Sequence, residues 1–202
     1  MKYTMIIPVY RIQGLRLRNL KFNLNRIEKS NIDCKVVIAE QKSDIRIENE
    51  IIKDFDHFIF DLDSDIFHKT RLMNIASKKV ECDWFWFHDI DVYIPYKKVF
   101  EEVKKSEGLY DAISPYLEVF NLNEEHTENF IENKSVNITK SDNVKKFSEF
   151  SGGSFLIKKD KFIDLGMWNE DFKGWGYEDK HMSKLCKMKL KTKSIDENAV
   201  HL

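Results

Sequence analysis

Apolar and polar positions show two different spacings in the first half of the chain, one typical of strands and one typical of helices. Tyr3 to Val9 is an apolar run of strand length. From Leu15 to Ile27, apolar residues recur at close to helical spacing. The same reasoning predicts further strands at 34–39, 57–60, 83–87 and 110–114, and helices at 45–52, 69–79 and 96–105.

Strands and helices that take turns in this way indicate βαβ units. We therefore predict an α/β protein with a mostly parallel sheet flanked by helices, and 202 residues suit a single domain. In such sheets a ligand binds beyond the carboxyl ends of the strands. Residues at those ends are the first candidates for a functional site.

The segment 121–149 breaks the alternation, because it is polar, charged and nearly without periodicity. We predict a long mobile loop with one helical turn, which suits either a lid over a substrate or a passive insertion. Beyond it, the pattern predicts a strand at 154–158, a helix near 160–165 and a helix that runs to about Met188.

Positive and negative charges are nearly balanced. Lys and Arg number 33 against 34 Asp and Glu, which gives a net charge of −1 and no electrostatic support for a nucleic-acid partner. One local basic run, Lys184 to Lys193, suits either the solvated face of a helix and strand or peripheral contact with an anionic membrane surface.

The three cysteines, Cys34, Cys82 and Cys186, are far apart and include no Cys-x-x-Cys pair. They indicate neither a zinc site nor a disulfide framework, and they fit a reducing compartment. The N-terminal apolar run is too short for a signal peptide, and no apolar stretch reaches the roughly 20 residues of a membrane span. We therefore expect a cytoplasmic protein.

Asp89 and Asp91 follow the very apolar strand predicted at 83–87. In an extended segment, residues two apart point to the same side. Two carboxylates on one side can bind Mg²⁺ or Mn²⁺, because these ions prefer oxygen ligands and also bridge phosphate oxygens. The alternative is an ordinary turn at a strand end, since the same pattern also occurs at Asp61–Asp63.

A second acidic pair, Glu178 and Asp179, follows Gly174, Trp175 and Gly176 at a predicted helix start. Acids at this place can cap the helix, which would explain one of the two. An indole face beside carboxylates also suits a sugar ring, through stacking and through acceptors for its hydroxyls. A carboxylate within hydrogen-bond reach of a hydroxyl can act as a general base.

Three weaker signals complete the candidates. Gly152–Gly153 let the backbone turn sharply or approach a ligand. Arg11, Arg16 and Arg18 suit either a phosphate group or the surface of a helix. His201 is a candidate imidazole ligand, although a lone histidine is more often structural.

Together these segments resemble the β-1,4-galactosyltransferase family and its bacterial relatives of the chondroitin-polymerase type, which are inverting glycosyltransferases with the GT-A fold. The resemblance runs in order along nearly the whole chain. It is most specific at Phe172–Asp179, which is similar to the family's Trp-Gly-Gly-Glu-Asp motif. The other matching segments are Ile7–Arg11, Val37–Gln41, Phe67–Asn74, Phe87–Asp91 and Ser151–Phe155.

The resemblance implies a metal site and a catalytic base. Asp91 would bind Mn²⁺ or Mg²⁺ directly, and His201 would match the family's late metal-ligand histidine. Asp89 would contact either the nucleotide ribose or the waters of the ion. Asp179 would take the proton of the acceptor hydroxyl.

The resemblance also implies how the substrates are held. Residues 1–115 would form the nucleotide-sugar-binding half, and residues 150–202 the acceptor and catalytic half. The implied contacts of the nucleotide sugar are Pro8, Tyr10, Arg11, Glu40, Lys69 and Asp89. The implied contacts of the transferred sugar or the acceptor are Gly152, Gly153, Trp175, Gly176 and Glu178.

Three positions depart from the family pattern. Tyr177 replaces the second glycine of Trp-Gly-Gly and would narrow the sugar pocket. Lys180 stands where members often carry another acid, and Lys69 stands where the family has an arginine that contacts the nucleotide.

The sequence thus predicts an inverting, metal-dependent glycosyltransferase. It would move a galactose-, N-acetylgalactosamine- or N-acetylglucosamine-type sugar from a UDP-sugar to a glycan acceptor, in bacterial surface polysaccharide synthesis. Two alternatives remain open. One is a non-catalytic or truncated module that binds nucleotide sugars or glycans. The other is a sugar-phosphate nucleotidyltransferase, which would need a glycine-rich, basic phosphate loop near the N-terminus.

Overall fold

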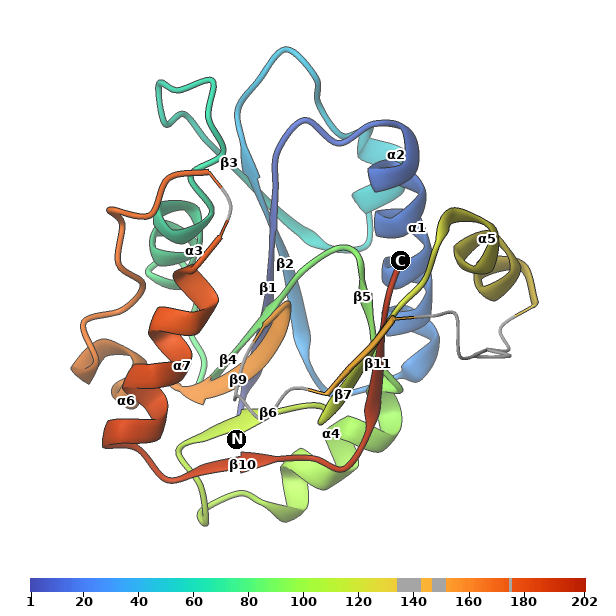
Figure 1. The fold of residues 1–202 in the computed structure, drawn as a ribbon. Helices are drawn as coiled ribbons and strands as arrows, with labels where there is room; N and C mark the ends of the chain where they lie inside the picture. Colours follow the sequence, from blue (N-terminus) through green and yellow to red (C-terminus); the bar gives the residue numbers. More distant parts are fainter. Residues whose placement is uncertain (134–142, 147–151, 175) are drawn as a thin grey trace.

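The computed structural model describes residues 1–133, 143–146, 152–174 and 176–202. Its main feature is a seven-stranded sheet with the order β10-β6-β9-β4-β1-β2-β3 (Figure 1). Neighbouring strands are parallel except at β9, which is antiparallel to β4 and β6. This confirms the predicted mostly parallel α/β sheet. The strands are β1 (Tyr3–Val9), β2 (Lys35–Gln41), β3 (Asp56–Phe60), β4 (Trp84–His88), β6 (Ala112–Ser114), β9 (Ser154–Lys158) and β10 (Thr192–Ser194).

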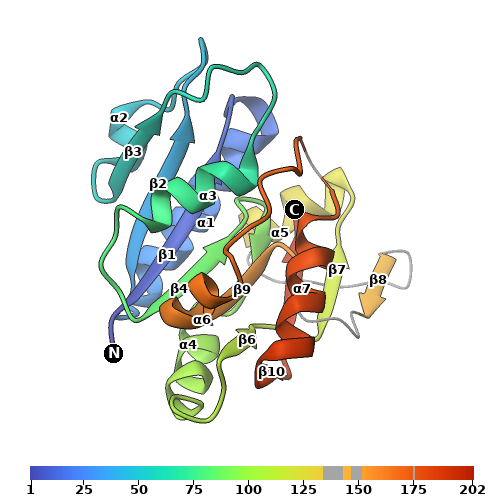
Figure 2. The same ribbon diagram turned by 90° about the vertical axis from the view of Figure 1, so that its left-hand side faces the viewer.

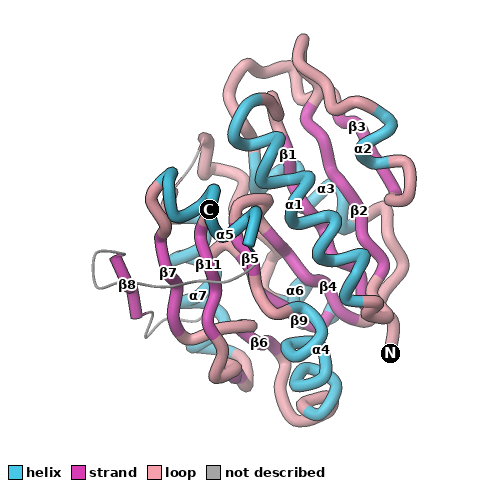
Figure 3. Tube along the Cα trace, turned by 90° about the vertical axis from the view of Figure 1, so that its right-hand side faces the viewer, coloured by secondary structure: helices cyan, strands magenta, loops and turns pink. Residues whose placement is uncertain are grey.

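Helices cover both faces of this sheet (Figures 2 and 3). Met5 and Ile7 of β1 share one apolar core with α1 and α4, whereas Ile6 belongs to a second core with α3, α6 and α7. Because successive strand residues point to opposite faces, a sheet covered on both sides requires the continuous apolar runs seen in the sequence. The helices are α1 (Gly14–Ser30), α3 (Lys69–Ser77), α4 (Tyr96–Lys105), α6 (Lys159–Asp164) and α7 (Glu178–Lys189).

A smaller sheet of four short strands has the order β5-β11-β7-β8. Strand β11 lies antiparallel to β5 and parallel to β7, and β8 lies antiparallel to β7. This sheet brings the last residues of the chain beside the segment that follows β4. Its strands are β5 (Val92–Tyr93), β7 (Glu118–Asn121), β8 (Asn143–Lys146) and β11 (Asn198–His201).

Part of the segment predicted as a long loop is regular. The helix α5 spans Glu124–Asn133, so the helical part is longer than the single turn predicted. Phe130 packs edge-on against Tyr93, which holds α5 near the smaller sheet. Only Thr127 and Phe130 of this helix are buried, too few to produce a visible helical period. The rest of the predicted loop, apart from β7 and β8, lies outside the described residues or in short connections.

The second helix begins later than predicted, since α2 spans only Asn49–Ile52. The residues before it are held by side-chain hydrogen bonds. Ser43 Oγ bonds both backbone groups of Ile45, and the Glu40 carboxylate accepts from the N–H of Ile47 at 3.3 Å. Such local bonds compete with helix formation. In the described ranges, no helix is long and apolar enough to cross a bilayer.

Candidate active site

Three segments meet at the carboxyl edge of the parallel strands. Asp89 follows β4, Lys69 begins α3, and Glu178 and Asp179 begin α7. The Lys69 ammonium lies 2.8 Å from Asp89 Oδ2, 3.3 Å from Glu178 Oε1 and 3.9 Å from Asp179 Oδ2. We call these four residues the lysine–carboxylate cluster. It joins the two acidic segments that stand out in the sequence.

The lysine–carboxylate cluster is largely buried and has more negative than positive charge. Burial raises the pKa of Asp89 to about 7, helped by Asp179 and Asp91 and opposed by Lys69. Burial alone would lower the pKa of Lys69, but the three carboxylates outweigh it and raise that pKa, so the ammonium stays charged. One ammonium faces three carboxylates. The cluster therefore favours a bound molecule that brings hydroxyl donors or a cation.

Asp91 faces the C-terminal strand. His201 Nε2 lies 3.7 Å from Asp91 Oδ2, and His201 Nδ1 lies 3.0 Å from Asn121 Oδ1. Strand pairing fixes this arrangement, because His201 stands opposite Val92 of β5 and Asn121 of β7. Burial would raise the pKa of Asp91, but the hydrogen bond and charge of His201 lower it below its usual value.

The pair of Asp91 and His201 fits a divalent cation. A carboxylate oxygen and an imidazole nitrogen suit Mn²⁺, and metal-binding histidines commonly bond a polar partner through the other ring nitrogen, as His201 does with Asn121. Among the described residues, no three His, Cys, Asp or Glu side chains form a metal-binding group. The described part of the chain therefore offers this pair of ligands, which suits an ion that keeps waters and binds phosphate oxygens. Asp89, also predicted for the metal, accepts from Lys69.

The glycine pair Gly152–Gly153 also helps to hold the turn that follows β4. Asp89 N–H donates to Gly153 O at 2.6 Å. Gly153 has φ +63°, and a Cβ there would lie 2.5 Å from Val92 Cγ2, so a side chain at this position would force the turn to move. The glycines thus position Asp89, in addition to any contact with substrate.

A buried chain of hydrogen bonds supports the same turn from beneath. Asn23 Nδ2 donates to the Ile90 carbonyl at 2.6 Å, and Asn23 Oδ1 accepts from Tyr96 OH at 3.0 Å. His88 Nε2 lies 2.8 Å from Tyr96 OH. Because the Tyr96 hydroxyl donates to Asn23, its oxygen accepts from His88 Nε2–H.

This assignment fixes the state of His88. Burial lowers the pKa of His88 to about 4, so the ring is neutral and carries its proton on Nε2. His88 Nδ1 then accepts from Ser154 Oγ at 2.8 Å, and Ser154 Oγ accepts from Trp86 Nε1 at 2.9 Å. The chain of donors therefore runs from the core of the sheet to Ile90, between the two aspartates. Sequence reasoning missed these supporting residues, since their partners are far apart in the chain.

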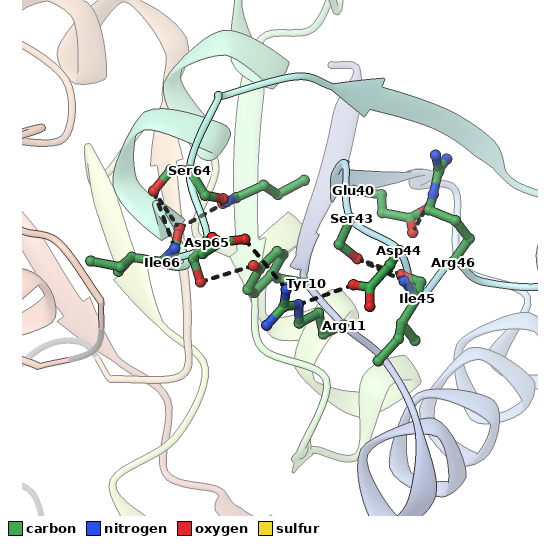
Figure 4. Close-up of polar contacts among 11 residues, drawn as sticks. Tyr10, Arg11, Glu40, Ser43, Asp44, Ile45, Arg46, Ser64, Asp65 and Ile66 are labelled. Carbon is green, nitrogen blue, oxygen red and sulfur yellow. Dashed lines mark hydrogen bonds and ion pairs between the residues drawn. The ribbon is translucent and has the colours of Figure 1, made fainter.

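A second group of polar contacts surrounds the end of β1 (Figure 4). Arg11 lies between two loops, with Nε 3.4 Å from Asp44 Oδ1 and Nη2 3.4 Å from Asp65 Oδ1. Tyr10 OH donates to the Asp65 carbonyl, and the Tyr10 ring stacks on Phe67 with centroids 5.8 Å apart. These contacts gather the loops after β1, β2 and β3 around a half-buried arginine and two aromatic rings.

Glu40, predicted to contact the nucleotide, has a buried carboxylate with protein partners. It lies 2.9 Å from Arg46 Nε and 2.7 Å from His57 Nε2 (Figure 4 shows the arginine contact). The next residue, Gln41, donates to the carbonyls of Ser64 and Ile66. Glu40 and Gln41 therefore shape the loops that surround Arg11.

The remaining predicted residues lie near the two groups. Pro8 is buried in β1 beside Ala39 of β2. Gly176 N–H donates to Glu178 Oε2 at 2.9 Å, which bends the chain just before α7. Tyr177 adopts φ +65°, a left-handed conformation that suits glycine better, and is 71% exposed. Trp175, predicted to contact sugar, lies outside the described residues.

Solved structures with a similar fold include TarS, a galactosyltransferase and GalNAc-T7. TarS of S. aureus has a TM-score of 0.69 at 14% identity, over 100% of this chain and 36% of TarS. Drosophila β1,4-galactosyltransferase 7, with manganese, UDP-Gal and xylobiose, scores 0.58 at 12% identity over 95% of this chain and 64% of that protein. GalNAc-T7 with UDP, GalNAc and Mn²⁺ scores 0.65 at 13% identity, over 100% of this chain and 44% of that protein. This chain therefore spans less than two thirds of each.

The sheet order and the acidic edge thus define a glycosyltransferase fold of the GT-A class. Residues 4–202 match the family described as glycosyltransferase like family 2, and the chain belongs to this family. Family membership makes the chain a glycosyltransferase domain; it does not select the β-1,4-galactosyltransferase subfamily. No curated protein sequence matches the chain.

Proposed function

We propose that the chain is the catalytic domain of an inverting transferase, which moves a sugar from a UDP-sugar to a hydroxyl of a glycan. One observation carries this proposal: Asp179 Oδ2 lies 3.9 Å from Lys69 Nζ, in the same cluster as Asp89. A carboxylate able to take a proton thus lies beside groups suited to the donor. A TarS structure with UDP-GlcNAc and the galactosyltransferase with UDP-Gal support a nucleotide-sugar donor.

Asp179 is the proposed base. It accepts the proton of the acceptor hydroxyl while the hydroxyl oxygen attacks the anomeric carbon, from the face opposite the diphosphate. The new carbon–oxygen bond forms as the bond to the diphosphate oxygen breaks, and UDP leaves with the electron pair. Attack from the opposite face inverts the anomeric configuration.

Lys69 is proposed to offset negative charge near the departing diphosphate, and its buried position strengthens that effect. A divalent cation, Mn²⁺ or Mg²⁺, would be held by Asp91 and His201 and would supply further neutralisation of the diphosphate. Asn121 would keep the His201 ring in the orientation needed for this. Asp89, bonded to Lys69, would contact the ribose or the waters of the ion.

The donor nucleotide is proposed to bind beside the end of β1, within residues 1–115. Tyr10 and Pro8 would line the base and ribose, and Arg11 would meet phosphate oxygens once it leaves Asp44 or Asp65. Glu40 would support this site through the surrounding loop. In residues 150–202, the sugars would be held by Gly152, Gly153, Trp175, Gly176 and Glu178.

The donor sugar is proposed to be of the galactose, N-acetylgalactosamine or N-acetylglucosamine type, and the acceptor a glycan of a bacterial surface polysaccharide. The domain is proposed to be cytoplasmic and to act at the inner face of the membrane. The basic run Lys184 to Lys193 covers the end of α7 and the start of β10, where it would make peripheral contact with anionic lipid.

The test is release of UDP from UDP-Gal, UDP-GalNAc and UDP-GlcNAc with Mn²⁺ and an array of glycan acceptors. We expect acceptor-dependent turnover of one donor. Asp179→Asn should lower kcat at least a hundredfold while UDP still binds, because removal of a general base affects chemistry more than nucleotide affinity. Asp171→Asn, an exposed residue of the preceding loop, is the matched control.

Two results would reject the proposal. UDP-sugar binding without turnover, across the acceptor array, would favour a non-catalytic module. Formation of pyrophosphate from UTP and a sugar phosphate would favour a nucleotidyltransferase.

A further inference from the structure

Tyr116 brings a hydroxyl group to the edge of the site described above, although nothing in the sequence singled it out. It follows β6, which is parallel to β4 because both are antiparallel to β9. The residues that follow β6 and β4 therefore emerge at the same edge of the sheet. Tyr116 itself is only 3% exposed, and its ring belongs to the core beneath α1 and α4.

The Tyr116 hydroxyl lies against the glycine pair. A Cβ built at Gly153 would be 3.6 Å from the hydroxyl oxygen, and one at Gly152 would be 3.9 Å from it. Gly153 also accepts from the Asp89 amide. The glycine pair therefore leaves space beside the hydroxyl and links it to the turn that holds Asp89.

The hydroxyl has a proton to donate. Among the residues that the structure describes, no hydrogen bond donated by the Tyr116 hydroxyl is found, and the nearby Ser154 N–H donates to the Gly152 carbonyl at 2.6 Å. Burial, reinforced by Asp179 and Asp89, raises the pKa of Tyr116, so the group remains a neutral phenol. A hydroxyl whose proton is not committed to a protein acceptor is available to donate to a bound molecule.

The charged residues around the Tyr116 hydroxyl limit which chemical groups could bind to it. Asp179 and Asp89 influence the phenol electrostatically, and Lys69 acts in the opposite direction more weakly, so the phenol lies in the field of the lysine–carboxylate cluster. Because one ammonium faces three carboxylates, a neutral hydroxyl fits beside the phenol better than a second anion, and an apolar group would leave the phenol unbonded. A sugar hydroxyl fits both the phenol and the carboxylates, because it accepts a hydrogen bond from the phenol and donates one to a carboxylate. Between the proposed base and the donor-side aspartate, the transferred sugar is the group expected.

We propose that the Tyr116 hydroxyl donates a hydrogen bond to one ring hydroxyl of the donor sugar and thereby selects the sugar that the domain accepts. This inference rests on the proposed function, since it deepens the assignment of the same site. The hydrogen bond is lost when the sugar lacks or inverts that hydroxyl. Selection of this kind acts on donor binding, before any transfer to an acceptor.

The experiment is calorimetric titration of the domain, with Mn²⁺, using UDP, three UDP-sugars and the 2-, 3-, 4- and 6-deoxy derivatives of the UDP-sugar that binds most tightly. Tyr116→Phe keeps the packed ring and removes only the hydroxyl. We expect its affinity for the parent UDP-sugar to fall about tenfold, with UDP affinity unchanged. For one deoxy derivative, wild type and Tyr116→Phe should bind equally. Tyr110→Phe, at the start of the same segment, is the matched control.

The possible outcomes distinguish failure of the Tyr116 assignment from failure of the proposed transferase activity. Equal sugar affinities for Tyr116→Phe and wild type overturn the assignment of Tyr116, and so does an equal loss on every deoxy derivative. An effect confined to the KM of the acceptor also overturns it, in favour of an acceptor contact. If the sugar-dependent loss is seen but no transfer occurs, Tyr116 is confirmed as a sugar contact and the proposed transferase activity fails. Thermal unfolding of both variants checks that the fold is intact.

Discussion

Lys69 Nζ lies 2.8 Å from Asp89 Oδ2, and this ion pair joins the start of α3 to the segment that leaves β4. The same ammonium reaches Glu178 and Asp179 of α7. A single buried cation therefore holds together the elements proposed to bind the donor and the element proposed to carry the base. Its loss would affect both structure and chemistry.

Lys69→Met should destabilise the protein by about 3 kcal/mol, because it leaves buried carboxylates without their cation. Urea unfolding followed by fluorescence measures the change. Lys79→Met, at an exposed position after α3, is the control and should unfold like wild type. If Lys69→Met is as stable as Lys79→Met, the cluster is not an ion pair network in solution. Lys69→Arg should retain part of the stability, since it keeps the charge.

Metal affinity should depend on the contact between His201 and Asn121. His201→Ala removes a proposed ligand and should weaken Mn²⁺ binding about a hundredfold, and Asn121→Leu should weaken it about tenfold by releasing the ring. Electron paramagnetic resonance of free Mn²⁺ during a titration gives both constants. His126→Ala, on α5, should have no effect. Equal Mn²⁺ affinity for His201→Ala and wild type would exclude this histidine as a ligand.

Glu40→Ala distinguishes support of the loop from direct contact with the nucleotide. The carboxylate is 1% exposed and bonds Arg46, His57 and the backbone of Ile47, so its removal should cost about 3 kcal/mol of unfolding free energy. UDP affinity, measured well below the unfolding transition, should fall less than it does for Arg11→Ala. Glu48→Ala is the exposed control. A large loss of UDP affinity with unchanged stability would instead support the contact predicted from the sequence.

Asp111 should make stability depend on acid pH. Burial would raise its pKa, but hydrogen bonds from Lys158 and the Lys191 backbone, at 2.9 and 3.1 Å, lower it below the ordinary value. A carboxylate whose pKa is lower in the folded protein stabilises the fold above its unfolded pKa of about 4 and loses this effect as the pH falls through the folded value. Charge-assisted bonds of this kind contribute about 2 kcal/mol.

Asp111→Asn should therefore be less stable than wild type by about 2 kcal/mol at pH 7, and the difference should shrink towards zero below about pH 3. Urea unfolding at pH 7, 5 and 3 measures this. Asp54→Asn, at an exposed turn after α2, should show no such trend. A difference that stays constant down to pH 3 would assign the effect to packing and not to charge.

The sheet was predictable from the sequence because its strands are buried on both faces. Such strands appear as continuous apolar runs, and the predicted limits of β9 and α4 agree with the structure. The smaller sheet was not predictable. Val92–Tyr93 is too short to show any alternation, and the partner of this strand lies more than 100 residues later, at Val200 and His201. Pairing at that distance leaves no local pattern.

The candidate site likewise has residues that the sequence predicted and residues that it did not. Asp89, Asp179 and Lys69 were predicted from motifs, and the structure brings them together. Tyr116 and the supporting residues Asn23 and Tyr96 carry no motif, since their contacts cross from one element to another. The one available signal for Tyr116 was its position directly after a predicted strand, at the edge where ligands bind.

The position of β9 has a consequence for how the protein forms. This strand is synthesised late, yet it fills the gap between β4 and β6, and β6 has no earlier neighbour. An emerging chain of 115 residues would expose the β4 edge and leave its last strand without any partner. The parts proposed to bind the donor and the acceptor should therefore not fold one after the other, and polypeptides severed between α5 and β9 should regain a native sheet only on mixing.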